Sequence, residues 1–214
     1  MLGRITARQR GDTLIEVLFA ITVFSLIVVT TLSLMNQGTA AARRSVESTL
    51  VREQLDAQAE TLRFMHQSYV MQYRPGAPTV STGPAAEYKK VIDHVITANR
   101  KDATPLSSDK VCPAIPTDAF VVNPRTAVLS VDTAKIVSPE AGYAQLSFDP
   151  TNNADMTSRG IWIEAIRTNV EAPLSSLTAT AGYIDYYIRG CWYAPGSGRA
   201  LSMGTIVRLY EPRG

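Results

Sequence analysis

A long apolar stretch near the N-terminus constrains this chain more than any other feature. From Leu14 to Met35 the only interruptions are Glu16 and a few Ser and Thr residues. About 20 residues, at a rise of about 1.5 Å each, cross the hydrocarbon core of a bilayer, which is about 30 Å thick. We therefore expect residues 14–35 to enter a membrane as a helix.

The flank before this stretch is basic. Arg4, Arg8 and Arg10 precede it, and no acidic residue occurs before Asp12. The positive-inside rule keeps such a flank in the cytoplasm. Everything after Met35 is then expected on the exported side.

Glu16 requires an explanation, because it is an acid inside an apolar helix. A carboxylate in the bilayer costs roughly 2.5 to 3.5 kcal/mol on insertion scales, so it is rare without a partner. One explanation is local: Thr13 and Glu16 have the spacing of a capping box, and a carboxylate in the first turn favours the positive end of the helix dipole. The other explanation considers Glu16 together with Gly11, which lies five residues before it.

The segment from Arg10 to Val29 resembles the cleavage and methylation segment of type IV prepilins. The shared features are a short basic leader, a Gly directly before a polar residue, and the sequence TLIEV at the start of the apolar helix. In that family a prepilin peptidase cuts on the cytoplasmic side after the glycine and methylates the new N-terminus. The apolar helix stays on the mature protein. The resemblance therefore implies processing between Gly11 and Asp12.

The resemblance also implies that Glu16 acts in assembly. A buried carboxylate needs a cation, and the α-ammonium group of a neighbouring subunit supplies one inside a packed filament. Asp12 stands where the family usually has Phe, so its own carboxylate competes with Glu16 for that ammonium group. The implied partners are other pilin subunits, the prepilin peptidase, the pilus assembly machinery and the membrane around residues 14–35, with no cofactor.

Two other kinds of targeting segment fit part of this pattern. A secretory signal could be cut after the three alanines at 40–42, but the apolar region of such signals is usually only about 7 to 15 residues long. An uncleaved signal anchor explains the span and the arginines. It does not explain Gly11 and Glu16 together.

The helical pattern continues beyond the apolar stretch. No Pro occurs between Met1 and Arg74, so one helix is expected from about Thr13 to about Tyr73, apolar all round at first and amphipathic later. The apolar positions of the later part recur at steps of three and four: Val51, Leu55, Ala59, Leu62, Met65 and Tyr69. The expected segments are a leader (1–11), a membrane and assembly helix (12–35), its amphipathic continuation (36–74) and an exported head (75–214).

Strands are expected to dominate the head, after a short helix that begins at Pro84. The apolar face of that helix is Tyr88, Val91, Ile92, Val95 and Ile96. Segments rich in β-branched and aromatic residues predict strands at 119–122, 127–131, 143–148, 161–168, 183–193 and 205–210. Short links between the later strands favour an antiparallel meander. The expected fold class is α+β, a long helix laid on an antiparallel sheet, which the resemblance to pilins also implies.

Both cysteines, Cys112 and Cys191, follow the apolar stretch. A bridge between them suits an exported head and would close about 80 residues, worth up to roughly 4 to 5 kcal/mol in the chain-entropy model. Related pilins often have one disulfide in the C-terminal part of the head, usually with a shorter loop. The alternative is a pair of buried free thiols in a reducing compartment.

One candidate ligand site is a group of oxygen-bearing side chains. Asp149, Asn152, Asn153 and Asp155 are ligands of the kind that Ca²⁺ prefers. They lack the spacing of a known calcium loop, and Asx residues are equally typical of turns. Calcium binding and an ordinary turn both remain open at this point.

A second candidate site combines arginine with tyrosine on the last strands. Its members include Arg167, Arg189, Arg208 and Tyr187. Such residues on one sheet face could bind single-stranded DNA or a surface sugar by charge and stacking, or could form a solvated or subunit-facing surface. The net charge of +2 is too small to indicate nucleic acid by itself.

The sequence gives little reason to expect an enzyme. It has two histidines, His66 and His94, and no Gly-x-Ser-x-Gly elbow, P-loop or His-Glu-x-x-His motif. The expected function is a structural subunit of a type IV pilus or pseudopilus, and a minor pilin because of Asp12 and the large head. It would be a single-pass membrane protein before assembly and part of the extracellular pilus afterwards. The alternatives are an adhesive or DNA-binding tip pilin and a signal-anchored extracytoplasmic enzyme.

Overall fold

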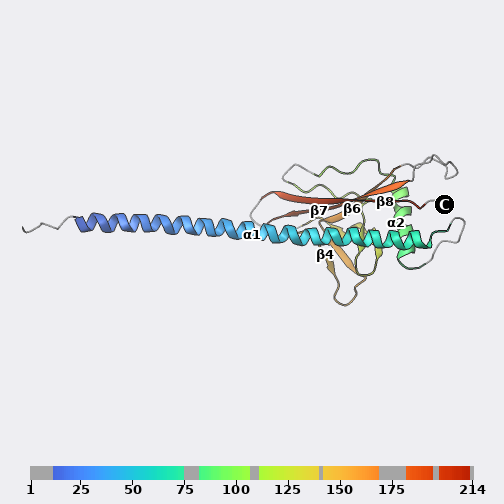
Figure 1. The fold of residues 1–214 in the computed structure, drawn as a ribbon, viewed down its shortest axis with the longest axis horizontal. Helices are drawn as coiled ribbons and strands as arrows, with labels where there is room; N and C mark the ends of the chain where they lie inside the picture. The colour runs from blue at the N-terminus through green and yellow to red at the C-terminus, as the bar shows by residue number, and fades with distance from the viewer. Residues whose placement is uncertain are drawn as a thin grey trace, which may run out of the picture. The chain divides into compact units, whose positions relative to one another are not determined.

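The structure is a computed structural model that describes residues 12–74, 82–106, 111–139, 142–168, 182–194 and 198–212. The chain divides into two compact units, Met1–Ser45 and Val46–Gly214, and helix α1 belongs partly to each. The elements are α1 (Asp12–Gln72), α2 (Pro84–Ala98), β1 (Val121–Asn123), β2 (Val128–Ser130), η1 (Thr133–Lys135), β3 (Ile136–Val137), β4 (Gln145–Phe148), β5 (Met156–Arg159), β6 (Ile161–Thr168), β7 (Tyr183–Tyr193) and β8 (Ala200–Tyr210). The α+β class is confirmed, with a long N-terminal helix followed by mainly antiparallel sheets (Figure 1).

The first unit consists, in its described part, of the start of α1. Its side chains from 13 to 39 are all exposed, including the large apolar ones. The helix passes Gly38 without a break, because no Pro interrupts the backbone hydrogen bonds. This helix is long and apolar enough to cross a membrane, which supports the expected anchoring.

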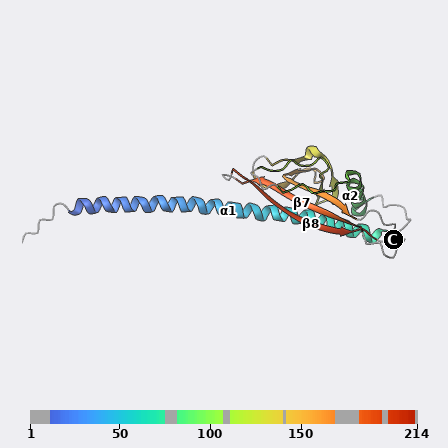
Figure 2. The ribbon, with the colours of Figure 1, turned by 90° about the horizontal axis from the view of Figure 1, so that it is seen from above.

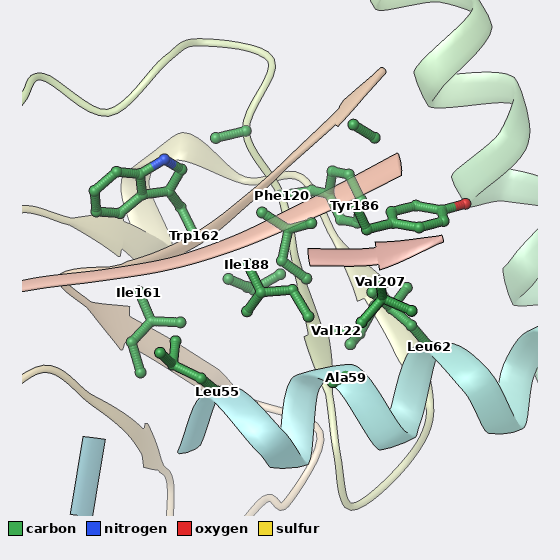
Figure 3. Close-up of a cluster of buried hydrophobic side chains, with 14 of the residues drawn as sticks. Leu55, Ala59, Leu62, Phe120, Val122, Ile161, Trp162, Tyr186, Ile188 and Val207 are labelled. Atoms are coloured by element: carbon green, nitrogen blue, oxygen red, sulfur yellow. The ribbon is translucent and has the colours of Figure 1, made fainter. Parts of the chain in front are cut away.

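The second unit begins with the amphipathic part of α1. The predicted apolar positions from Val51 to Met65 are buried, and Tyr69 is half-buried. Figure 3 shows Leu55, Ala59 and Leu62 pointing from α1 toward the strands, where they meet residues such as Ile188 and Val207. The helical period of three and four residues therefore marked the packed face correctly.

The main sheet of the head has the strand order β6-β7-β8. Both pairs are antiparallel, so the three strands form the predicted meander; Figure 1 labels all three strands, and Figure 2 shows β7 beside β8. The bounds predicted for β6 and β7 are confirmed, but β8 begins at Ala200 rather than at Thr205. The missed residues, 200–204, include Ser202 and Gly204, which have low strand propensity, and pairing with β7 holds them extended.

Two smaller sheets complete the described part of the head. One pairs β1 with β2, and the other has the order β3-β5-β4, in which β3 and β5 are parallel. Strands β3 and β5 were not predicted, because β3 has only two residues and β5 has the polar sequence MTSR. The expectation that the head strands form one antiparallel sheet is therefore corrected to three sheets.

Helix α2 begins at Pro84, as predicted, and ends where Asn99 adopts a left-handed conformation with φ of 45°. Tyr88, Val91, Ile92 and Val95 are buried, whereas Ile96 is 47% exposed and does not belong to the packed face. A buried amide joins α1 to β1: Gln58 Nε2 donates to the carbonyl oxygen of Val122 at 2.5 Å, and its Oε1 accepts from Val122 N–H at 2.9 Å. This pair satisfies the backbone of Val122, two residues after Phe120, whose own N–H and C=O groups bond to Ile163 of β6.

Candidate functional sites

Glu16 lies in the second turn of α1, surrounded by exposed apolar side chains. Leu14, Ile15 and Val17 are 68%, 69% and 56% exposed. Among the residues that the structure describes, no group forms a hydrogen bond or ion pair with the Glu16 carboxylate. In a membrane, this carboxylate would therefore need a partner from outside the described residues.

The hydroxyl groups of the same stretch behave differently, because they bond to their own helix. Thr22 Oγ1 donates to Phe19 O at 2.7 Å, and Ser25 Oγ donates to Ile21 O at 2.8 Å. Thr30 and Thr31 make the same kind of bond one or two turns later. Glu16 differs from these side chains, because it has no local hydrogen-bond partner among the described residues.

The capping explanation of Glu16 receives no support from local contacts. Helix α1 begins at Asp12, which places Thr13 inside the helix rather than at the cap. Among the described residues, no side-chain hydrogen bond links Thr13 and Glu16. Gly11 and the side chain of Asp12, which belong to the expected processing site, lie outside the described residues.

Alternation along β7 divides its side chains between two faces. A Cβ on Gly190 would lie 3.2 Å from Val51 Cγ1, so the even-numbered residues of β7 face α1 and the odd-numbered residues face away. We call the face away from α1 the outer face. Its members, given by the strand register, include Trp162, Glu164, Ile166, Tyr183, Asp185, Tyr187, Arg189, Cys191, Ile206, Arg208 and Tyr210. Figure 3 shows Trp162 on the opposite side of the sheet from Leu55.

The loop after α2 covers one end of the outer face, where Glu164 is the central group. The Glu164 side chain has no exposed surface. Its Oε1 accepts from Trp162 Nε1 at 2.8 Å, and its Oε2 accepts from Thr104 N–H at 2.7 Å. The guanidinium groups of Arg100 and Arg189 lie 3.2 and 3.4 Å from its two oxygens, which supplies the cations that a buried carboxylate needs.

Arg189 is therefore occupied within the head. It is only 6% exposed, and its Nη1 donates to the carbonyl oxygen of Thr104. On the other side of this network, Arg100 forms a two-point ion pair with Asp118. Hydrogen bonding to Arg100 holds the pKa of Asp118 below its ordinary value.

The other end of the outer face is not covered by a described segment. There Arg208 forms a two-point pair with Asp185, at 2.7 and 2.8 Å, and stacks 4.0 Å from the ring centroid of Tyr183. Tyr210 and Ile206 beside it are 55% and 60% exposed. The surface is aromatic, and its one arginine is neutralised.

The predicted arginine and tyrosine site is thus only partly brought together. Arg189, Arg208 and Tyr187 share the outer face, but Arg167 lies opposite Ile184 on the face toward α1. Arg167 binds Glu211 through two bonds, of 2.5 and 2.8 Å. Phosphate backbones are bound by cations that are free to pair with them, so these contacts do not favour nucleic acid, and ligand binding stays a prediction.

The oxygen-bearing group at 149–155 is occupied by protein donors. Asp149 accepts from the backbone and hydroxyl of Thr151, and the hydroxyl bond holds the pKa of Asp149 below its ordinary value. The other three oxygens accept from the following donors: Asn152 Oδ1 from Ala154 N–H, Asn153 Oδ1 from Arg125, and Asp155 Oδ1 from Lys135. Among the described residues no group of three His, Cys, Asp or Glu side chains is placed to hold a metal.

The remaining predicted residues have local roles in the head. Cys112 and Cys191 form a disulfide, with Cα atoms 5.8 Å apart, which ties the loop after α2 to the outer face. His66 Nε2 lies 2.8 Å from the carbonyl oxygen of Tyr210, and His94 Nε2 lies 2.9 Å from that of Asp118. A carbonyl only accepts, so each histidine donates from Nε2 and serves as a structural donor.

The chain was compared with protein families, curated proteins and solved structures. No protein family, curated protein or solved structure matches this chain.

Proposed function

We propose that this chain is a structural subunit of a type IV pilus or related pseudopilus, processed after Gly11 and polymerised through the first part of α1. The observation that supports this proposal is Glu16. It is the one acid of the apolar stretch 14–35, and no described group pairs with it. An ammonium group at the N-terminus of a neighbouring subunit would neutralise it.

Two further features agree with this assignment. The helix that contains Glu16 continues without interruption into a helix built into a folded head, as a filament spine requires. The head has a disulfide, which suits an exported location. Asp12, whose carboxylate competes with Glu16 for the ammonium group, supports a minor rather than a major subunit. The anchored protein would have a cytoplasmic leader and an exported head, and the assembled protein would be extracellular.

The test measures processing and assembly separately. Intact-mass analysis of the mature protein should show a chain that begins at Asp12, with or without one added methyl group. Gly11→Leu should retain the leader, because the peptidase must accommodate a small residue before the cut. Glu16→Ala should be cleaved normally but should be absent from sheared filaments, since the neighbouring ammonium group would be buried without its counter-charge. Glu16→Ala that enters filaments normally, or a mature N-terminus near Arg43, would overturn the proposal.

A further inference from the structure

Arg43 and Arg44 are the first charged residues after the apolar stretch of α1. Both side chains are exposed. Neither forms an ion pair or hydrogen bond with any residue that the structure describes. Two adjacent cations are therefore available to a partner other than the described residues.

Their position along the helix indicates what that partner is. Arg43 lies eight residues after Met35, which at the helical rise is about 12 Å beyond the end of the apolar stretch. The headgroup layer on each side of a bilayer is about 5 to 8 Å thick. The two Cα atoms therefore lie a few Å outside the headgroups when the apolar stretch fills the hydrocarbon core.

The direction of helical side chains lets the two guanidinium groups reach the headgroups from these Cα positions. In an α-helix the Cα–Cβ bonds tilt toward the N-terminus, and long side chains lean over the preceding turn. For Arg43 and Arg44 that turn lies on the membrane side. A guanidinium group on a long stem therefore reaches back toward lipid phosphates, which it matches in charge and hydrogen-bonding geometry.

We propose that Arg43 and Arg44 bind the phosphates of anionic lipids in the leaflet on the exported side of the membrane. This inference rests on the membrane-anchored stage of the proposed function, but on neither cleavage nor polymerisation. The pair would fix the depth of α1 in the bilayer and would have to release its lipids when a subunit is extracted. A basic residue near an anionic surface contributes about 1 kcal/mol, or roughly fivefold in local lipid association.

The experiment measures lipid selectivity around the full-length chain. The chain is reconstituted in phosphatidylcholine vesicles with a trace of spin-labelled phosphatidylglycerol or spin-labelled phosphatidylcholine. Electron spin resonance separates the lipids held at the protein from those in the bulk. The preference for phosphatidylglycerol should fall at least about threefold in R43Q/R44Q, should be largely kept in R43K/R44K, and should weaken in high salt.

Arg52→Gln is the matched control. Arg52 is also exposed on α1, has no partner among the described residues, and lies nine residues further from the apolar stretch. Its substitution should leave the selectivity unchanged, and the leader arginines are the same in all variants. Equal selectivity in the wild type and R43Q/R44Q, or an equal fall in Arg52→Gln, would overturn the inference. Processing at Gly11 and entry into filaments are measured separately on the wild type, so a failure of this inference can be distinguished from a failure of the proposed function.

Discussion

The two parts of α1 form one helix but are stabilised by different surroundings. In the first unit, large apolar side chains such as Phe19 and Leu26 are 69% and 68% exposed. In the second unit, Leu55 and Leu62 are 2% and 0% exposed, because they pack in the core of the head. The sequence already distinguishes the two cases, because the first part is apolar all round and the second part is amphipathic. The apolar side chains of the first part are exposed, whereas those of the second part are covered by the rest of the head.

Polar residues show the same difference. In the first part hydroxyl groups such as those of Thr22 and Ser25 bond to the backbone of their own helix, and Glu16 has no described partner. In the second part Gln58 is fully buried, yet both its polar atoms bond to Val122, which is 64 residues away in sequence. Gln58 is thus satisfied by the fold of the head, whereas Glu16 has no partner among the described residues.

Removing the disulfide should give the largest difference in stability between the two parts of α1. Replacing Cys112 and Cys191 by Ser should lower the free energy of unfolding of the head by about 2 to 5 kcal/mol, because a link across 79 residues no longer restricts the unfolded chain. Hydrogen exchange in detergent micelles should become faster in the part of α1 after Val46. It should stay slow in the apolar part, where the surroundings offer no competing hydrogen bonds. Equally faster exchange in both parts would show that they are one cooperative unit.

Shortening one leucine side chain in each part of α1 should have a smaller effect on the stability of the head, and only the substitution in the second part should have it. Leu62→Ala should destabilise the head by about 3 kcal/mol, within the usual range of about 2 to 5, because it leaves a cavity beneath the sheet. Leu26→Ala, the same substitution on the exposed part, should change head stability by less than about 0.5 kcal/mol. Denaturant unfolding followed by the fluorescence of the buried Trp162 and Trp192 measures both. A similar loss of head stability in Leu26→Ala would show that the first part of α1 also stabilises the head.

The smallest expected effect is the pH dependence of the stability of the head. Pairing with Arg100 lowers the pKa of Asp118 in the folded head. A lowered carboxyl pKa stabilises the fold above the ordinary value, near 4, and this contribution is lost as the pH falls through the folded value. Asp118→Asn should therefore cost about 1 kcal/mol at pH 7 and less at pH 3, relative to the wild type at the same pH. A cost that stays constant between these pH values would show that the charge is unimportant.

Local sequence patterns were enough to predict α1, α2, β6 and β7. Each is a long element with a regular pattern: three- and four-residue steps in the helices, and β-branched and aromatic runs in the strands. Strands β3 and β5 lack any such pattern. Ser158 and Arg159 of β5 pair with both β3 and β4, so distant partners rather than local propensity hold them extended.

The sites were predictable to a different extent. The isolated acid Glu16 and the two cysteines can be recognised without a fold, because each is rare in its surroundings. The network around Glu164 was missed, since its partners Arg100, Thr104 and Arg189 come from a loop and a second strand. Arg167 was grouped with Arg189 because sequence does not give the strand register that places them on opposite faces.

The contacts that complete the head also determine when it can form. Gln58 meets Val122, Cys112 meets Cys191, and His66 meets Tyr210, which is 144 residues further along the chain. At a synthesis rate of about 5 to 20 residues per second, the last of these partners appears about 7 to 30 seconds after the first. During this time Val51, Leu55 and Leu62 have been made but their sheet has not. The amphipathic part of α1 must therefore be protected from aggregation for several seconds in each round of synthesis.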